Sequence, residues 1–258
     1  MGVTPQNTKP PGRKFLSGRW LPDWLFPGQS LLSRQPLLRG GFLTAEDFAR
    51  LQFVQPPFCD HCGQPYDSPE HAGMICAACL ASPPLYGRAR SAFVYNDASA
   101  QMVLSLKRQG RRAALVWYGQ LMASAGAELL SDADLIIPVP LHYRRLASRG
   151  FNQAGWLASA VSQQVGIPVS LMALRRRKAS PSQGRLSPLQ RQRNVAGAFD
   201  IRHGYADRLS GKCVVLVDDV LTTGATLQAC VRALRKGRVQ NVDVLTLARV
   251  VAPKNPLI

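Results

Sequence analysis

Acidic residues are scarce in this chain. Its 258 residues include 15 Asp and Glu against 32 Lys and Arg, which gives a formal net charge of +17 at pH 7. This excess is larger than solubility alone calls for, and it creates an attractive field for polyanions such as nucleic acids, phosphorylated metabolites and anionic membrane surfaces. The composition therefore favours an anionic ligand or partner.

Long apolar runs are also missing. Residues 16 to 26 are interrupted by Arg19, Pro22 and Asp23, unlike a signal peptide, and no stretch approaches the ~20 apolar residues that a membrane-spanning helix needs. We therefore expect no transmembrane segment and a cytoplasmic location. With 46% hydrophobic residues, the chain is long enough for one substantial α/β core and a smaller module.

Four of the six cysteines form two C-x2-C pairs separated by 13 residues: Cys59, Cys62, Cys76 and Cys79. In a reducing compartment this spacing favours a tetrahedral four-thiolate Zn²⁺ site over disulfides. Such a site has no open position for water, so we expect the zinc to be structural. His61 and His71 are alternative ligands, but four thiolates already complete the coordination shell. Cys213 and Cys230 are interpreted as small buried hydrophobic residues.

Composition divides the chain into three parts. Residues 1–57 carry many prolines and are expected to be a poorly ordered basic extension, with one helix over 44–53 that begins at Thr44. Residues 58–86 form the expected zinc ribbon. Residues 87–258 form the expected main domain.

The main domain alternates between apolar strands and amphipathic helices. The strand segments DLIIPVP and CVVLVDD are almost continuously apolar, which indicates burial on both faces of a parallel sheet. We therefore predict an α/β fold, a parallel sheet flanked by helices. The expected strands are 90–97, 134–138, 212–217 and 241–246, and the expected helices are 99–110, 113–130, 153–165 and 225–236.

The segment VVLVDDVLTTGATL contains the most informative pattern. Asp218 and Asp219 are expected at the carboxyl edge of the sheet, where ligands of open α/β sheets collect. The backbone amides and hydroxyls of Thr222, Thr223, Gly224, Ala225 and Thr226 lead into a helix and would form an anion cradle. Acids directly before a phosphate cradle make sense if a sugar diol and Mg²⁺ lie between them.

Three rival interpretations explain less of this segment. A Walker B strand requires a G-x-x-x-x-G-K-[ST] loop, which the chain lacks. An aspartyl phosphotransferase requires D-x-D, and position 220 is valine. A helix cap by Thr222 or Thr223 leaves the acid pair unexplained.

A second strand, LIIPVP, is followed by Val139, Pro140 and three arginines, Arg144, Arg145 and Arg149. Cations beside exposed loop amides suit a diphosphate. The alternative is that these arginines only face solvent at a helix N-terminus, where the helix dipole disfavours cations.

The densest charge run, residues 175 to 193, has seven basic and no acidic residues. One interpretation is a solvated, partly mobile loop. The other is a loop that closes over an anionic ligand, with Arg175, Lys178 and Arg185 as the candidate catalytic cations.

The segment around Asp218 and Asp219 resembles the phosphoribosyl pyrophosphate (PRPP) motif of type I phosphoribosyltransferases. The resemblance implies that the two aspartates hold the ribose hydroxyls, directly or through Mg²⁺. It also implies that Thr222 to Thr226 bind the 5′-phosphate, and that a diphosphate loop follows the earlier strand. Salvage enzymes for 6-oxopurines have an aspartate where this chain has Thr222, and no base pocket can be named from the sequence.

Together with the cysteine pairs, the segments PVPLHYRRLASRGFNQA and SQGRLSPLQRQRNVAGAF look like the ComF/GntX family over about residues 58 to 250. That family is associated with competence and the uptake of transforming DNA. The resemblance implies PRPP or a related phosphoribosyl ligand, and it suggests single-stranded DNA and proteins of the competence machinery as partners.

Two hypotheses remain open. In one, the domain binds a phosphoribosyl ligand with Mg²⁺ and acts in the handling of single-stranded DNA, with Tyr143, Phe151 or Trp156 stacking bases unless they are core residues. In the other, it is an active phosphoribosyltransferase of nucleotide metabolism or salvage with an unidentified acceptor.

Overall fold

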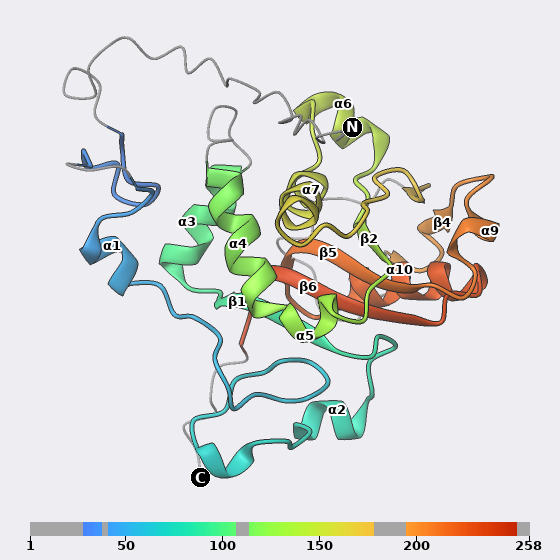
Figure 1. Ribbon diagram of the computed structural model, residues 1–258, viewed down its shortest axis with the longest axis horizontal. Coiled ribbons are helices and arrows are strands. Elements are labelled where there is room, and N and C mark those ends of the chain that lie inside the picture. Colours follow the sequence, from blue (N-terminus) through green and yellow to red (C-terminus); the bar gives the residue numbers. More distant parts are fainter. Residues whose placement is uncertain (1–27, 38–40, 107–113, 178–194, 252–258) are drawn as a thin grey trace, which may run out of the picture.

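A four-stranded, all-parallel sheet forms the centre of the computed structural model (Figure 1). The strand order is β1-β6-β5-β2, and the expected α/β class with a parallel sheet is confirmed. The strands are β1 (Ala89–Val94), β6 (Asn241–Arg249), β5 (Cys213–Leu221) and β2 (Leu135–Pro138). The structure describes residues 28–37, 41–106, 114–177 and 195–251.

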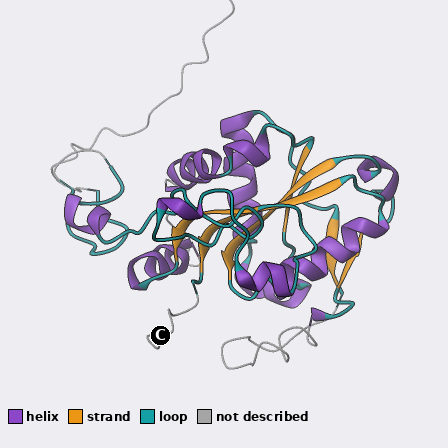
Figure 2. Cartoon of the chain, turned by 90° about the horizontal axis from the view of Figure 1, so that it is seen from below, coloured by secondary structure: helices purple, strands orange, loops and turns teal. Residues whose placement is uncertain are grey.

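Helices connect the strands and cover both faces of the sheet (Figures 1 and 2). None of the helices within the described residues has the length and apolar character needed to span a membrane. The helices are α1 (Ala45–Ala49), η1 (Pro69–His71), α2 (Ala77–Ala81), α3 (Asp97–Leu106), α4 (Leu115–Ala125), α5 (Ala127–Leu130), α6 (Tyr143–Arg149), α7 (Gln153–Val165), α9 (Ala206–Leu209) and α10 (Ala225–Lys236).

The central strand β5 is buried on both faces, which explains its continuously apolar sequence. Val215 and Val217 belong to a core cluster that also contains residues of α4 and α7. Val214 and Leu216 belong to a second cluster with residues of α10. Because successive side chains of a strand point to opposite faces, a strand between two helical layers needs apolar residues at every position.

Helices α4 and α7 pack closely on one face of the sheet. A Cβ atom at Gly119 of α4 would lie 2.8 Å from the backbone carbonyl of Ala160 in α7, so glycine permits the close approach. The single helix expected over 113–130 is instead two helices, α4 and α5, because the chain leaves helical geometry at Gly126. Glycine leaves room at this break for the Leu245 side chain, whose end would lie 2.8 Å from a Cβ atom there.

The chain before the cysteine module packs onto the core from residue 28 onward. Leu31, Leu32 and Leu51 are buried in the cluster that contains α4 and α7. Asp47 accepts hydrogen bonds from the hydroxyls of Ser30 and Ser33, which tie the segment to α1. This packing differs from the poorly ordered extension expected over 1–57, because apolar side chains between the prolines reach the core. Residues 1–27 lie outside the described residues.

Strands β5 and β6 extend beyond their expected ends. The predicted strands stopped at residues 217 and 246, whereas β5 runs to Leu221 and β6 to Arg249. Val220 pairs with Ala248 and Leu221 with Arg249, so the ladder continues past the acid pair. Asp218 and Asp219 therefore lie within the second half of β5 rather than after it.

An unexpected hairpin flanks the basic segment. Strand β3 (Leu174–Arg176) pairs antiparallel with β4 (Phe199–Ile201), which contacts α10. The first residues of the predicted basic loop are therefore strand residues. Residues 178–194, which include Lys178 and Arg185, lie outside the described part of the chain.

The contact between α4 and α7 can be tested with two glycine substitutions. We expect Gly119→Ala to lower the free energy of unfolding by roughly 1–2 kcal/mol, because the added methyl group overlaps the backbone of α7. Gly155→Ala in α7 is the matched control, since its Cβ atom would meet only Asn152 at 3.5 Å. The control should gain up to about 1 kcal/mol through helix propensity. Urea denaturation measures both, and equal effects of the two substitutions would contradict this packing.

Candidate functional site

The carboxyl edge of the sheet holds the candidate site. Backbone hydrogen bonds join the segments that leave this edge. Val139 N–H donates to the carbonyl of Val217 at 2.8 Å, and Val250 N–H donates to that of Leu221 at 2.8 Å. Tyr95 N–H donates to the carbonyl of Arg249 at 2.6 Å. The residues that follow β1, β2, β5 and β6 therefore lie at one edge of the sheet, and these hydrogen bonds fix their backbone positions.

A cavity of about 320 Å³ lies at this rim. It brings together the acid pair and the whole cradle predicted from the sequence. It also includes the residues that directly follow β1 and β6, and one residue of α3, which sequence reasoning missed. Its lining residues are Tyr95, Val103, Asp218, Asp219, Val220, Thr222, Thr223, Gly224, Ala225, Thr226, Leu227 and Val250.

The acid pair is half-buried at the cavity. Asp218 accepts a hydrogen bond from the backbone N–H of Asp219 at 2.9 Å. Asp218 interacts electrostatically with Cys230 of α10 and with Arg176 of β3. Burial, followed by the negative charge of Asp218, raises the pKa of the Cys230 thiol well above its usual value. Cys230 is thus a buried neutral thiol, in agreement with its interpretation as a core residue.

The cradle consists of exposed Thr222 and Thr223 followed by Gly224, which begins α10. Gly224 has a φ of 72°, a left-handed conformation that favours glycine. The N-cap of α10 provides no side-chain hydrogen bond to the first turn. The first amides of α10 and the positive end of its dipole are therefore directed towards the cavity mouth, as an anion site requires.

The loop after β2 lies beside β5 but does not line the cavity. Val139 and Pro140 are buried. His142 caps α6 by accepting a hydrogen bond from the Arg144 backbone N–H at Nδ1, 3.3 Å away. Arg144 and Arg145 therefore occupy the first turn of α6, and α6 ends at Arg149. The pairing of β2 with β5 puts the segment that leads into α6 beside Val217, and none of Val139, Pro140, Arg144 and Arg145 is among the residues that line the cavity.

Of the predicted cations in the basic segment, Arg175 turns away from the site. Its guanidinium lies 3.3 Å from the Asp200 carboxylate on β4, and Arg177 also approaches Asp200, at 3.5 Å. Arg176 points to the other face of β3, where its guanidinium lies 5.3 Å from the centre of the Phe199 ring. Successive side chains of a strand point to opposite faces, so Arg175 and Arg176 are separated. A strand predicted at 174–176 would have indicated this from the sequence.

The negative charge of Asp218 affects the pKa of Arg176, the middle residue of β3. Burial lowers the pKa of its guanidinium and the positive charge of Arg145 lowers it further, whereas Cys230 and Asp218 act in the opposite direction. Two cations, Arg145 and Arg176, therefore lie close enough to interact beside Asp218. A negative ligand group between them would relieve their mutual repulsion.

The remaining missed residues have different signals. Tyr95 and Val250 directly follow β1 and β6, so the rule that ligands collect at carboxyl strand ends, applied to every strand, would have identified them. Val103 lies in α3, and its sequence position carries no such signal.

The four predicted metal ligands converge. The Sγ atoms of Cys59, Cys62, Cys76 and Cys79 all lie within 4.8 Å of one another. Cys62 and Cys76 are 3.7 Å apart, close to the ~3.8 Å expected between two sulfurs on one tetrahedral zinc. This donor set is compatible with zinc. The alternative ligands, His61 and His71, are not part of the group found among the described residues.

Hydrogen bonds prepare one of these thiols for metal binding. Burial raises the pKa of Cys59, but backbone N–H groups, including that of Cys76 at 3.3 Å, lower it to about 7. The thiolate is the ligating form, so this environment favours coordination near neutral pH.

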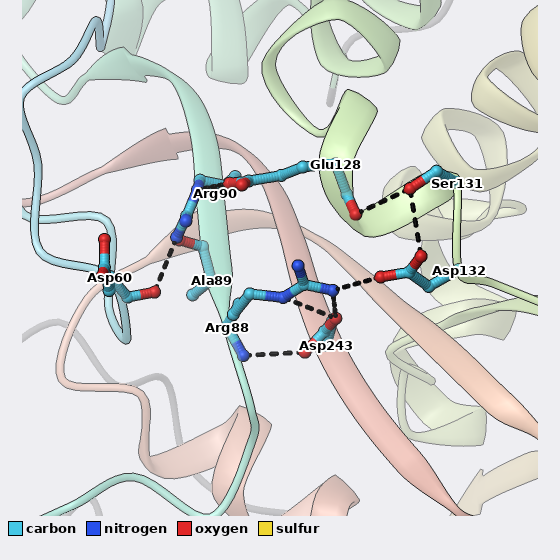
Figure 3. A network of polar contacts seen from close by, with 8 residues as sticks. All are labelled: Asp60, Arg88, Ala89, Arg90, Glu128, Ser131, Asp132 and Asp243. Carbon is cyan, nitrogen blue, oxygen red and sulfur yellow. Dashed lines mark hydrogen bonds and ion pairs between the residues drawn. The ribbon is translucent and has the colours of Figure 1, made fainter. Parts of the chain in front are cut away.

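The cysteine module is fastened to the sheet by two arginines. Buried Arg90 of β1 donates to the carbonyl of Asp60 and pairs with Glu128 of α5 (Figure 3). Its guanidinium also lies 4.4 Å from the centre of the Phe58 ring. Arg249 at the end of β6 donates to the Cys62 carbonyl and to Gln64. These bonds hold the module against strand β1 and the end of β6.

A second network, also drawn in Figure 3, lies beside the Arg90 contacts. Arg88 bridges Asp132 at 2.9 Å and buried Asp243 at 3.0 Å. It connects the chain before β1 with the segment after α5 and with β6.

The module also reaches the cradle through Tyr86. This tyrosine is 6% exposed, and a Cβ atom at Gly224 would lie 4.0 Å from its hydroxyl. Burial and the nearby cysteines Cys62 and Cys79 raise the pKa of Tyr86. Tyr86 is therefore neutral at physiological pH and lies between the cysteine cluster and the turn at Gly224.

We expect the purified protein to contain one zinc ion per chain. Cys62→Ser should abolish this zinc, because three thiolates and a hydroxyl form a much weaker site. It should also lower the melting temperature by several degrees, since the module's contacts with the sheet depend on its fold. Cys213→Ser, outside the cluster, is the control that should keep its zinc. Metal analysis and thermal denaturation measure both effects, and full zinc content in the Cys62 variant would rule out this ligand set.

Comparisons with known proteins identify the family of this chain. A model of the phosphoribosyl transferase domain matches residues 148–256. The DNA utilization protein YhgH of Salmonella typhimurium is 31% identical over 231 residues, which cover 86% of this chain and 97% of that protein. Competence protein F of Haemophilus influenzae is 30% identical over 198 residues, covering 75% and 85%.

Solved structures resemble the chain more distantly. The glutamine PRPP amidotransferase from B. subtilis is 24% identical over 52% of this chain and 26% of its own, with a TM-score of 0.35. Orotate phosphoribosyltransferase from Aeropyrum pernix is 16% identical over 63% and 81%, with a TM-score of 0.33.

The parallel sheet, the acid pair and its loop, and the matching domain model together define a protein with a phosphoribosyltransferase-type domain and a four-cysteine metal module. The similarity to YhgH spans nearly the whole of that protein. The chain belongs to the ComF/YhgH family of competence and DNA utilization proteins.

Proposed function

We propose that the cavity at the carboxyl edge binds PRPP or a related phosphoribosyl compound together with Mg²⁺, and that the protein uses this site in the handling of single-stranded DNA. The observation that carries the first part is that Asp218, Asp219 and the residues 222–226 line one cavity. The two carboxylates suit a sugar diol and a divalent cation, and the cradle of residues 222–226 suits a phosphate.

Each part of such a ligand has a matching group. The amides and hydroxyls of the cradle would accept the 5′-phosphate at the start of α10. Asp218 and Asp219 would bind the ribose hydroxyls, and their carboxylates are the ligands that Mg²⁺ prefers. When bound, the Mg²⁺ would supply charge neutralisation beside the diphosphate.

The diphosphate would extend across β5 towards the loop after β2. Val139 is hydrogen-bonded to Val217, immediately before the acid pair. Arg145 and Arg176 interact electrostatically there, and Arg144 lies in the same turn of α6. The predicted closing segment around Lys178 and Arg185 belongs to this proposal as a further source of positive charge.

Transfer of the phosphoribosyl group to an acceptor is the alternative function. The same groups would stabilise a departing diphosphate and a cationic sugar, mainly by positioning and charge. Release of pyrophosphate from PRPP, with formation of a nucleotide in the presence of a nucleobase, would favour this alternative over binding alone.

Titration of Mg-PRPP into the purified protein tests the ligand. We expect saturable binding by calorimetry that requires Mg²⁺. Asp218→Asn combined with Asp219→Asn should weaken it by at least about tenfold, because a hydrogen bond to a charged group contributes about 1.5–3 kcal/mol. The matched control is Asp207→Asn, an exposed acid of α9. Equal weakening by the control, or no binding to the wild-type protein, would contradict the proposal.

A role in DNA handling is supported by the names of the relatives and by the charge of +17. Helix α6 adds an exposed aromatic-basic pair at the same edge of the sheet. Tyr143 is 63% exposed, and the Arg144 guanidinium lies 5.9 Å from the centre of its ring. The other two expected stacking residues, Phe151 and Trp156, stack on each other at 3.9 Å, and Phe151 is buried.

We expect labelled single-stranded DNA to bind in a salt-dependent manner. Tyr143→Ala with Arg144→Ala should weaken binding by about tenfold, through loss of one stacking contact and one phosphate contact. The matched control is Tyr205→Ala with Arg208→Ala, a pair with a similar 5.8 Å contact at the start of α9, which precedes β5 at the opposite edge. Fluorescence anisotropy at several salt concentrations measures both, and equal losses would indicate unspecific charge attraction only.

A further inference from the structure

The cysteine module exposes apolar side chains around its short helix α2. No residue from 72 to 87 carries a charge. Among the large hydrophobic side chains that the structure describes, Leu80 of α2 is the most exposed, at 67%, and Met74 and Ile75 are 50% and 37% exposed. Together with the exposed alanines of α2, these three side chains form what we call the module face. Clustered exposed apolar residues of this kind mark interaction sites.

Hydrogen bonds fix the backbone of the module face. The carbonyl of Met74 accepts hydrogen bonds from the Asp60 N–H at 3.3 Å and from the Tyr66 hydroxyl at 3.2 Å. The N–H of Leu80 donates to the carbonyl of Cys76, one of the metal ligands, at 3.0 Å. The side chains are thus exposed on a backbone that is already ordered. Such a pre-organised surface loses little conformational entropy when a partner binds.

The charge around the module face is negative. From residue 58 to residue 87 the sequence has no Lys or Arg, whereas Asp60, Asp67 and Glu70 are all exposed. Four thiolates also outnumber the charges of the zinc ion that they would hold. This face therefore repels nucleic acid and anionic membranes, although the net charge of the whole chain attracts them. The complementary partner is a basic peptide segment with large apolar side chains.

The chain itself contains a segment of this composition near its N-terminus. Residues 13–26, RKFLSGRWLPDWLF, include three basic residues and one acid. They also include four aromatic residues, among them Trp20 and Trp24, which are two of the four tryptophans in the chain. Trp and Arg are the residue types most enriched at the energetic centres of interfaces. These residues lie outside the described part of the chain, so the match is one of charge and composition.

The point where this segment joins the described structure decides which copy of the module it can contact. Gly28 is held near α1, because the hydroxyl of Ser30 donates to Asp47 in that helix. Figure 1 shows residues 28–37 at the upper left and α2 at the lower end of the molecule. Trp20 is eight residues from Gly28, which is about 26 Å of extended chain, whereas a domain of this size is roughly 40 Å across. The tryptophans therefore fall short of the module in their own copy.

We propose that residues 13–26 of one copy dock on the module face of a second copy, and that the exchange is reciprocal. Reciprocal exchange closes a two-fold dimer in which both module faces are covered. The second docking event is intramolecular, which raises the affinity of the dimer. The tryptophans pack on Leu80 and Met74, and the basic residues lie beside Asp60 and Glu70.

Analytical ultracentrifugation of the full chain tests the dimer. At micromolar concentration its mass should be about twice the 28.2 kDa of one chain. Leu80→Asp should weaken dimerisation at least about tenfold, because it places a charge at the apolar centre of the interface. Trp20→Ala combined with Trp24→Ala should have a similar effect. The matched control is Leu171→Asp, at a site that is 50% exposed in the turn before β3, and it should remain dimeric.

A mixture of the two kinds of variant tests the exchange itself. The Leu80→Asp chain keeps its N-terminal segment and the tryptophan variant keeps its module face, so one docking contact can form between them. The mixture should therefore associate more strongly than either variant alone. Because Leu80 is next to the metal ligand Cys79, full zinc content and unchanged thermal melting identify the variants that are correctly folded.

Every result supports or overturns the proposal. A monomeric wild-type protein overturns it, as does a dimer that Leu80→Asp or the tryptophan substitutions leave intact. A mixture that associates no better than its components places the segment on its own copy and excludes the exchange. Equal loss of the dimer in Leu171→Asp places the interface elsewhere. Weakening of the dimer by added salt supports the charge complementarity, and a dimer insensitive to salt contradicts it.

Discussion

The hydrogen-bonded register of β5 between β6 and β2 is the constraint on which the site depends. Strand β5 is buried on both faces and continues in the ladder with β6 to Leu221. Two carboxylates are thereby held on a rigid strand rather than on a loop, and the turn into α10 follows at a fixed place. Because β2 ends beside Val217, the arginines of α6 lie at the same edge of the sheet as the acid pair, although the two segments are far apart in the sequence.

Several like charges lie close together around the site, and their repulsion opposes folding. Arg145, Arg176 and Asp218 interact electrostatically, and the pKa of Arg176 is lowered by burial and by its cationic neighbour. Cations in the first turn of α6 also oppose the helix dipole. Such arrangements cost stability in the protein without ligand, and they are typical of sites that meet an anion.

The four-cysteine module is part of the packing of the main domain, because it contacts both ends of the sheet. Arg90 fastens it to β1 and α5, Arg249 fastens it to the end of β6, and Tyr86 lies against the turn at Gly224. The module therefore lies against the turn that leads from β5 into α10. A short, cysteine-rich segment gains its fold from metal ligation, and here that local fold supports a site built by residues more than a hundred positions away.

The sequence by itself determined the α/β class, the four cysteine ligands and the composition of the acid pair and cradle, because each of these is written in local spacing and periodicity. It did not determine that β5 runs past the acid pair, or that Arg175 pairs with Asp200 while Arg176 lies over Phe199 on the other face of β3. Those features depend on ladder pairing and on the β3–β4 hairpin, which join distant segments. The rule about strand ends points to the residues that follow each strand, but only the tertiary structure shows that Tyr95 and Val250 line one cavity, because the parallel ladder aligns the ends of β1 and β6.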